Sequence, residues 1–303
     1  MAILIDENTT VVIQGITGGI GKLVTEHMLH SGTKILAGVT PGKGGQAVLG
    51  VPVFNSVGEA KAEHPSLNTS LVVVPPLAAK AAVFEAIEAG IKILCVFTET
   101  IPVHDEAAMI EKARENGCTL VDPASVGIIS PGIGRIGAIG GYPDQVAMIY
   151  KPGPVGIISR SGGMTNETAW VVRQAGLGQS TVVGIGGEPL IGTGFADLLV
   201  RFEHDEQTKA VAMFGEIGGS YEEDIAQVLK EKKFTKPLVV YIAGAFAEHL
   251  PSDIQFGHAG AIISKGTGKQ SHKIAVLKAA GAHIVRYHHE LGPKVKELIG
   301  EQE

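Results

Sequence analysis

The sequence has few cysteines, few aromatic residues and no long apolar run, and these shortages exclude several classes of protein. Its 303 residues include two cysteines, Cys95 and Cys118, and no CxxC or Cys/His cluster of the kind that holds structural zinc. Both lie in apolar stretches and are expected to be buried, reduced thiols. There is no apolar run of about 18 residues, and the first residues do not resemble a signal peptide. We therefore expect a cytoplasmic protein with no membrane span and no metal site of its own.

Positive charge is also scarce. The chain has 25 Lys and Arg against 31 Asp and Glu, a formal net charge of −6 at pH 7, and no cluster of basic residues. We therefore expect neither a nucleic-acid nor an anionic-membrane partner. Glycine, in contrast, is abundant: 41 glycines accompany 45% hydrophobic and 18% charged residues. This composition is typical of an α/β enzyme with many glycine turns.

Short β-branched runs alternate with helical stretches, which predicts parallel sheets covered by helices on both faces. In the first half we expect strands at 10–15, 34–39, 70–75, 92–97 and 118–123. Helices are expected between them at 22–31, 78–89 and 105–116. In the second half we expect strands at 155–159, 181–187, 210–219, 237–244 and 283–287. Helices are expected there at 166–174, 196–203, 221–231 and 272–280.

These patterns predict an α/β fold with two domains. The first is a Rossmann-like domain with a parallel sheet over residues 1–127. A Gly- and Pro-rich connecting segment with one short strand follows over 128–154. The second domain, over 155–303, is expected to have a flavodoxin-like layout.

A glycine loop, GITGGIG at 15–21, follows the first predicted strand directly. Its glycines allow a tight turn and close approach of a ligand, and the next helix offers free N–H groups to a phosphate. An NAD enzyme would place an acidic residue after the second strand, but the sequence there is GVTPGKGG at 38–45, with Lys43 in a glycine frame. A cation suits the additional phosphate of CoA or NADP. A turn without a ligand and a surface lysine are the simpler alternatives.

The second half has a similar loop, SRSGG at 159–163, between a predicted strand and a helix. Hydroxyls, glycines and a helix N-terminus predict a second anion site, with a simple capping loop as the alternative. A GxSxG nucleophile elbow is not formed. A GxxxxGK[ST] loop is also absent, since SKGTGKQ at 264–270 does not fit it. A nucleotide is therefore expected to bind mainly on another chain.

One of the eleven histidines has an unusual setting. His258 lies between small residues in FGHAGAI at 256–262, and Glu216 is expected to end an apolar strand at the carboxyl edge of the second sheet. A carboxylate that accepts a hydrogen bond from one imidazole nitrogen fixes the tautomer and makes the other nitrogen a better nucleophile. Such a histidine can carry a phosphoryl group. A structural histidine is the alternative that spacing alone leaves open.

Together these segments resemble the α subunit of the succinyl-CoA synthetase family over nearly the whole chain. The matching segments, in order, are VIQGITG, GVTPGKGG, FTE-x-IP, VGIIS-SG, VGIGG, GEIGGS and FGHAGAI. The resemblance implies that His258 is phosphorylated and that Glu216 positions it. It implies that CoA is bound by Thr17, Gly18, Gly19, Ile20, Lys43, Phe97, Thr98 and Glu99. It implies a phosphoryl or substrate loop made of Ser159, Ser161, Gly162, Gly163 and Asn166.

The resemblance also implies partners and a reaction. A β-type ATP-grasp subunit would bind ATP or GTP with Mg²⁺, in an αβ or α2β2 assembly. The nucleotide would phosphorylate His258, the phosphohistidine would phosphorylate a small carboxylic acid, and the CoA thiol would attack the acyl phosphate. The reaction would be reversible.

Two segments depart from the succinate enzymes. The sequence has DPASVG at 122–127 in place of a GPN-type segment, and Asn166 in place of a tyrosine. With Ile254 and Gln255, these resemble ATP-citrate lyase and citryl-CoA synthetase. A short amide in place of a phenol would enlarge and repolarise the site, which suits a tricarboxylate. Succinate remains our first expectation, because GLGQSTVVGIGGEPLIG at 176–192 follows the succinate enzymes and no citrate-synthase-like domain is present. Citrate and a non-catalytic CoA-binding regulatory protein are the alternatives.

Overall fold

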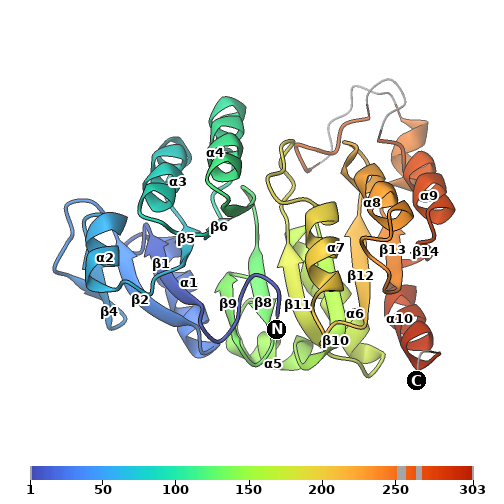
Figure 1. Ribbon diagram of the computed structural model, residues 1–303, viewed down its shortest axis with the longest axis horizontal. Helices are drawn as coiled ribbons and strands as arrows, with labels where there is room; N and C mark the ends of the chain where they lie inside the picture. The colour runs from blue at the N-terminus through green and yellow to red at the C-terminus, as the bar shows by residue number, and fades with distance from the viewer. Residues whose placement is uncertain (1, 251–256, 264–267, 302–303) are drawn as a thin grey trace. The chain divides into compact units, whose positions relative to one another are not determined.

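The computed structural model describes residues 2–250, 257–263 and 268–301 (Figure 1). The chain divides into two units. The first unit is built from Leu4–Gln145 with Leu190–Thr193, and the second mainly from Val146–Pro189 and the chain from Gly194 onward. Each unit has its own parallel sheet with helices on both faces, so the predicted α/β fold class is confirmed. In the described residues, no helix is long and apolar enough to cross a membrane.

The sheet of the first unit has the Rossmann strand order. Its parallel strands lie in the order β4-β2-β1-β5-β6-β7, which is 3-2-1-4-5-6 when they are counted along the chain. The bounds are β1 Thr10–Gln14, β2 Lys34–Val39, β4 Val51–Phe54, β5 Thr69–Val72, β6 Ile93–Val96 and β7 Thr119–Val121. A short strand, β3 (Ala47–Val48), pairs antiparallel with β4. The helices are α1 Gly19–His30, α2 Val57–Glu63, η1 Pro76–Ala78, α3 Ala79–Glu88 and α4 Val103–Glu115.

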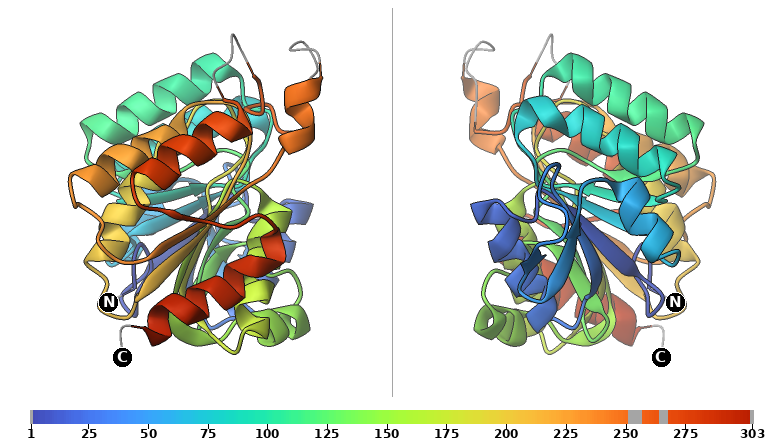
Figure 2. Two further views of the ribbon diagram at one scale, coloured as in Figure 1. Left: turned by 90° about the vertical axis from the view of Figure 1, so that its right-hand side faces the viewer. Right: turned by 90° about the vertical axis from the view of Figure 1, so that its left-hand side faces the viewer.

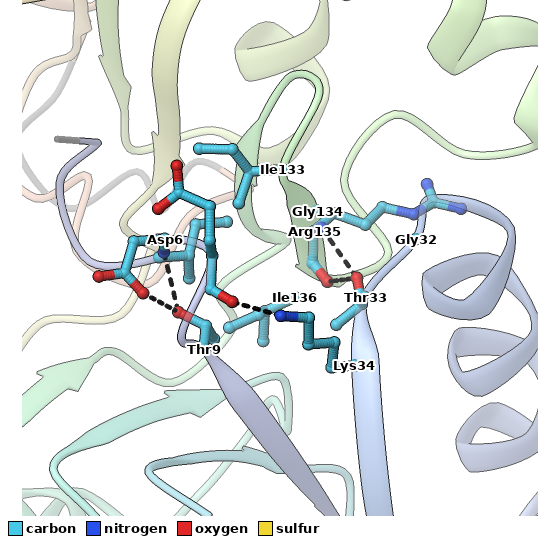
Figure 3. A pocket seen from close by; sticks show the side chains of 11 residues that line it. Asp6, Thr9, Gly32, Thr33, Lys34, Ile133, Gly134, Arg135 and Ile136 are labelled. Carbon is cyan, nitrogen blue, oxygen red and sulfur yellow. Dashed lines mark hydrogen bonds between the residues drawn. The ribbon is translucent and has the colours of Figure 1, made fainter.

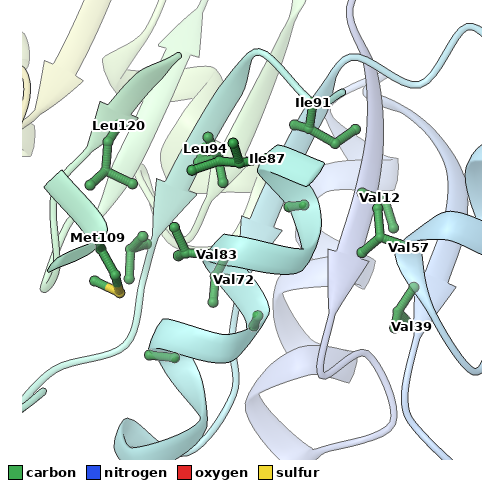
Figure 4. Close-up of a cluster of buried hydrophobic side chains, with 14 of the residues drawn as sticks. Val12, Val39, Val57, Val72, Val83, Ile87, Ile91, Leu94, Met109 and Leu120 are labelled. Carbon is green, nitrogen blue, oxygen red and sulfur yellow. The ribbon is translucent and has the colours of Figure 1, made fainter. Parts of the chain in front are cut away.

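The apolar residues that predicted these strands form the core of the unit. All five residues of β1 are buried, as expected for a central strand with helices on both faces. Helices α2, α3 and α4 lie side by side over a cluster that includes Val72, Leu94 and Met109 (Figure 4). The sheet thus holds the loops at its carboxyl edge in fixed positions.

The connecting segment has more structure than the single short strand we expected. It contains an antiparallel hairpin of β8 (Gly127–Ser130) and β9 (Gly134–Gly137), then α5 (Pro143–Ile149) and the start of β10. A Cβ atom at Gly127 would lie 1.9 Å from the Ile136 carbonyl oxygen. The glycines that suggested a loop therefore permit the close pairing of two strands.

The sheet of the second unit has the flavodoxin order. Its parallel strands lie in the order β14-β13-β12-β10-β11, which is 5-4-3-1-2 when counted along the chain. The bounds are β10 Pro152–Ser159, β11 Gln179–Gly184, β12 Ala210–Gly215, β13 Leu238–Ile242 and β14 His283–Ile284. The helices are α6 Gly162–Gln174, α7 Phe195–Glu203, α8 Tyr221–Lys230, η2 Ala245–His249, α9 Gln270–Ala279, η3 His288–Glu290 and α10 Leu291–Gly300. Helices α6 and α10 pack together, and α8 packs between α7 and α9; Figure 2 shows α9 and α10 on opposite faces of the sheet.

Several predicted strands are too long, and helices α2, α5 and α10 were not predicted. The predicted strands 210–219 and 283–287 end at Gly215 and Ile284. Helix α10 was missed because its start, Leu-Gly-Pro, has the composition of a turn. Proline is tolerated in the first turn of a helix, where its missing N–H has no partner to lose. Burial of Leu291 and Val295 then stabilises this helix.

Truncation of a core leucine tests the hydrophobic cluster. Leu94 is fully buried in β6, and we expect Leu94→Ala to lower the free energy of unfolding by about 2–5 kcal/mol. Leu77→Ala is the control, since Leu77 is 83% exposed and should change stability by less than about 0.5 kcal/mol. Urea unfolding followed by circular dichroism measures both. Equal effects of the two substitutions would contradict this assignment of the core.

Candidate functional site

A histidine and a glutamate meet at the carboxyl edge of the second sheet. Glu216 follows β12 directly, and its Oε2 lies 2.7 Å from Nδ1 of His258. The glutamate side chain is 11% exposed and the histidine side chain is 33% exposed. In the neutral ring this hydrogen bond needs the proton on Nδ1, which leaves the lone pair on Nε2. No residue in the described part of the chain forms a hydrogen bond with Nε2. The ring therefore presents a free nucleophilic nitrogen.

The glutamate also affects the charge of the ring. The hydrogen bond that His258 donates to Glu216 raises the pKa of His258 above its ordinary value of 6.5, while burial and the charge of Arg160 act in the opposite direction. Glu188 adds a weaker upward effect on the pKa. A group bonded to Nε2 would make the ring cationic, and the same carboxylate would stabilise that cation.

Glycines make room for the histidine. A Cβ atom at Gly187 would lie 2.8 Å from Cγ of His258, and one at Gly218 would lie 2.3 Å from the Gly260 carbonyl oxygen. Gly218 has φ +85°, and the Gly260 N–H donates to the Gly187 carbonyl oxygen at 3.0 Å. The segment around His258 thus packs directly on the loops that follow β11 and β12, and larger residues at these glycines would displace the ring.

Arg160 lies beside this pair and was missed in the sequence analysis, which named only its neighbours Ser159 and Ser161. Its side chain is fully buried, with Nε 3.6 Å from Glu216 Oε1 and Nη2 donating to the Glu188 carbonyl oxygen at 2.8 Å. Its Nη1 is buried without a hydrogen-bond partner among the described residues. An arginine at the end of an otherwise apolar strand was the available signal, since arginine is rarely buried without an anion.

The predicted anion loop forms the N-terminus of α6. Ser161 is the N-cap, with its hydroxyl accepting from the Met164 N–H at 3.3 Å, and the Ser159 hydroxyl donates to the Ser161 carbonyl oxygen at 3.0 Å. Gly162 begins the helix, and the Cα of Gly163 faces open space. The first N–H groups of a helix are free to bind an anion, and the dipole favours negative charge there.

Asn166 was expected to enlarge the site, but its side chain forms hydrogen bonds with neighbouring groups. Its Oδ1 accepts a hydrogen bond from the hydroxyl of Tyr150 at 2.6 Å, and its Nδ2 lies 3.4 Å from the Gly162 carbonyl oxygen. Tyr150 is 6% exposed. The phenol of Tyr150 thus lies beside the amide, which weakens the argument that Asn166 enlarges the site for a tricarboxylate.

The glycine loop of the first unit lies on a cavity of ≈ 560 Å³. Thr17 and Lys43 both line it, as does Lys22 of α1, which the sequence analysis did not name. Gly15 must be glycine, because it has φ +89° and a Cβ atom would lie 2.2 Å from the Val73 carbonyl oxygen. The full lining is Thr17, Lys22, Leu23, Glu26, Lys43, Gln46, Ala47, Val48 and Leu49. Two cations in one polar cavity suit a phosphate-bearing ligand.

The loop that carries Lys43 is held by Asn55. Its Oδ1 accepts from the N–H groups of Gly42 and Gly44, both at 3.0 Å. The next residues of the predicted CoA site, Phe97, Thr98 and Glu99, follow β6 at the carboxyl edge of the same sheet. The Thr98 hydroxyl donates to the Val74 carbonyl oxygen at 2.7 Å. These three residues do not line the cavity of Lys43.

A second cavity in the first unit has no room for such a ligand. It holds ≈ 30 Å³ and is lined by residues that include Thr33, Lys34 and Arg135 (Figure 3). The Thr33 hydroxyl donates to the Arg135 carbonyl oxygen at 2.6 Å, and Lys34 donates to the Glu7 carbonyl oxygen at 2.5 Å. This volume suits one or two waters at most.

The cysteines take no part in either site. Cys95 is buried, and burial raises the pKa of its thiol to about 12. Cys118 is half-buried, so the expectation of a buried thiol is met only by Cys95. Across the described ranges, no group of three or more His, Cys, Asp or Glu side chains could hold a metal ion.

Comparison with known proteins gives a family model for each half of the chain. The family model described as "CoA binding domain" matches residues 6–100, and the model described as "CoA-ligase" matches residues 158–283. The α 2 subunit of succinate–CoA ligase [ADP-forming] from Archaeoglobus fulgidus is 51% identical over 299 residues, which cover 99% of this chain and 100% of that protein. The chain belongs to the CoA-ligase family. Its first unit is the CoA-binding part, and CoA is its substrate.

Other relatives of this chain have names that refer to different acids. The succinate–CoA ligase [ADP-forming] α subunit from Methanothermobacter thermautotrophicus is 45% identical, over 98% of this chain and 97% of that one. An ADP-forming sulfoacetate–CoA ligase subunit from an Acholeplasma species is 40% identical over 98% of both chains. Among solved structures, ATP citrate lyase from Methanosaeta concilii in complex with (3S)-citryl-CoA has a TM-score of 0.92 and 28% identity. The alignment covers 99% of this chain and 51% of that one, so this CoA ligase spans about half the length of the lyase.

Removal of the Glu216 charge tests the electrostatics of the site. We expect Glu216→Gln to lower the pKa of His258 to its ordinary value of 6.5 or below, because only the weaker effect of Glu188 then opposes burial and Arg160. Titration of the histidine signals by NMR, with His258→Asn to assign the signal, measures the change. In the wild type the raised pKa stabilises the fold fully below pH 6.5, and this stabilisation is lost as the pH rises through the pKa of the folded protein. An unchanged pKa in Glu216→Gln would contradict the hydrogen-bond assignment.

Proposed function

We propose that this chain is the α subunit of an ADP-forming succinate–CoA ligase in which His258 carries the phosphoryl group. The observation that carries the proposal is the 2.7 Å hydrogen bond between Nδ1 of His258 and Glu216, with Nε2 free of partners among the described residues. The 51% identity to a succinate–CoA ligase α subunit over 99% of the chain supports succinate as the acid.

The chemistry follows from this pair. Nε2 of His258 attacks the terminal phosphorus of ATP, a P–N bond forms, and ADP leaves. The ring becomes cationic while it carries the phosphoryl group, and Glu216 stabilises that charge through Nδ1–H. A succinate carboxylate oxygen then takes the phosphoryl group, so the P–N bond breaks and succinyl phosphate forms. The CoA sulfur attacks the acyl carbon and displaces inorganic phosphate, which gives succinyl-CoA.

The surroundings of His258 suit a transferring phosphoryl group. The α6 N-terminus with Ser159, Ser161, Gly162 and Gly163 would receive its oxygens. Arg160 supplies a buried positive charge next to Glu216. Asn166, tied to Tyr150, would shape the wall on the acid side.

CoA is assigned to the cavity of the first unit. The loop of Thr17, Gly18, Gly19 and Ile20 would accept the pyrophosphate, and Lys43, with Lys22, would pair with a phosphate of the nucleotide end. Phe97, Thr98 and Glu99 are proposed to contact CoA outside this cavity. We also propose domain boundaries at 1–127 and 155–303 with a connecting segment at 128–154; the two family matches, 6–100 and 158–283, fall within these domains.

The nucleotide and the partner follow from the relatives. They are named ADP-forming and subunit α, which supports ATP in preference to GTP and a β-type subunit as partner. We propose that this subunit has an ATP-grasp fold, binds the nucleotide with Mg²⁺, and forms an αβ or α2β2 heteromer with this chain in the cytoplasm. The Mg²⁺ ion would neutralise the charge of the transferring phosphates.

Sulfoacetate is the second candidate acid, because two relatives of 40% identity over almost the whole chain are sulfoacetate–CoA ligase subunits. Citrate ranks lower, because the citrate enzymes are 28–29% identical to this chain. In addition, the phenol of Tyr150 lies beside Asn166, which stands where the succinate enzymes have a tyrosine.

Thioester formation tests the proposed reaction. The chain is co-expressed with the β-type subunit of its own genome and incubated with CoA, Mg-ATP and succinate, citrate or sulfoacetate in parallel. We expect succinyl-CoA with the wild type and a loss of at least about 1000-fold with His258→Asn, because the covalent carrier is gone. Asparagine is smaller than histidine and keeps a polar side chain at position 258. A circular dichroism spectrum shows whether the variant is folded. Citryl-CoA or sulfoacetyl-CoA as the main product would overturn the choice of acid, and activity in His258→Asn would overturn the mechanism.

Removal of Lys43 tests the CoA site. Lys43→Ala deletes one charge-assisted contact to phosphate, so we expect KM for CoA to rise about tenfold while kcat changes little. Lys230→Ala, on the exposed side of α8 in the other unit, is the control and should leave both constants unchanged. Initial rates over a range of CoA concentrations measure the effect. A KM equal to that of the wild type would place CoA elsewhere.

A further inference from the structure

A buried ion pair lies next to Glu216 and is not explained by the reaction described above. Lys273 is on α9 and Glu222 is on α8, and both side chains are 0% exposed. The two residues touch neither the His258 ring nor the N-terminus of α6 in any contact of the described structure.

The pair holds both backbone polar groups of Glu216. Nζ of Lys273 donates to the Glu216 carbonyl oxygen at 3.0 Å and to the Gly218 carbonyl oxygen at 2.5 Å, and it contacts Oε2 of Glu222. Oε1 of Glu222 accepts from the Glu216 N–H at 3.2 Å. The residue that carries the carboxylate is thus fixed on both sides of its Cα, at a point where β12 has ended and ladder hydrogen bonds no longer hold it.

Stability alone is a weak reason for this arrangement. Two buried charges lose their hydration, and a well-packed apolar pair of similar volume is often as stable or more stable. The three donor contacts of Lys273 instead specify a geometry, because each carbonyl oxygen must lie within hydrogen-bond distance of one nitrogen. Glycine at 215 is part of the same arrangement, since a Cβ atom there would lie 3.0 Å from Oε1 of Glu222.

We propose that Lys273 and Glu222 are positioning residues that fix the backbone of Glu216 and so keep its carboxylate on Nδ1 of His258. The inference rests on the proposed function, in which His258 carries the phosphoryl group. A shift of Glu216 by about 1 Å would break the 2.7 Å contact to the ring, and displacements of that size cost catalytic sites about 100-fold in rate.

The substitution Lys273→Met tests this inference, because methionine keeps the length of the side chain and loses its donors. We expect phosphorylation of His258 by Mg-ATP in the co-expressed complex to slow by about 10- to 100-fold, with KM for CoA unchanged. Lys278→Met is the matched control, since Lys278 is exposed on the same helix and should have no effect.

The pKa of His258 separates positioning from a simple effect of charge. The charged groups that act on the ring in the described structure are Glu216, Arg160 and Glu188. Loss of a nearby cation by itself would raise the pKa of a histidine, whereas release of Glu216 lowers it towards 6.5. We therefore expect NMR titration of the full chain to give a lower pKa for His258 in Lys273→Met than in the wild type. A raised or unchanged pKa would overturn the inference.

A double variant separates positioning from folding. Lys273→Met with Glu222→Met leaves no unpaired buried charge, so we expect its melting temperature to be restored towards that of the wild type while phosphorylation stays slow and the pKa of His258 stays low. If the double variant regains the wild-type rate and pKa, the pair serves stability only and the inference is overturned. If the wild-type complex itself does not phosphorylate His258, the proposed function fails, and the titration still decides whether the pair fixes Glu216.

Discussion

The hydrogen bond between Glu216 and His258 is the interaction on which the proposed chemistry of this chain depends. It exists because a parallel strand, β12, delivers Glu216 to the carboxyl edge of the sheet, where side chains and loops converge. The carboxylate sets the tautomer of the ring and leaves the lone pair on Nε2, the nitrogen that we propose takes the phosphoryl group. The other parts of the second unit serve this contact: glycines give the ring its space, and Arg160 places a cation against the second carboxylate oxygen.

Buried charge in the second unit is concentrated around this contact. Arg160, Glu222 and Lys273 are almost completely buried, and Glu216 is nearly so. Such groups are costly to bury unless each has a partner of opposite charge or a set of carbonyl oxygens. Here Lys273 pairs with Glu222 and Arg160 lies against Glu216, and both cations also donate to backbone carbonyl oxygens of the loops after β11 and β12. The charges therefore hold the loops in place, and the loops in turn hold the histidine.

Much of the CoA-binding unit could be predicted from the sequence. The near-continuous apolar strands predicted a parallel sheet, and the glycine loop with Lys43 after the second strand predicted a phosphate site without NAD. The hairpin at 127–137 could not be predicted, because its glycines are the residues of a loop as well as those of two closely paired strands. Lys22 was missed because a lysine on an exposed helix face carries no signal until the cavity beside it is known.

The sequence by itself determined the fold class, the alternation of strands and helices in both units and the two residues that we propose as the central pair, because periodicity and local motifs are properties of neighbouring positions. Only the tertiary structure decided which residues far apart in the sequence are in contact. It placed Arg160 against Glu216, put the phenol of Tyr150 beside Asn166, and held Glu216 with Lys273, 57 positions away. These contacts depend on the packing of whole helices and strands, and no spacing in the sequence encodes which buried charge will meet which carbonyl oxygen.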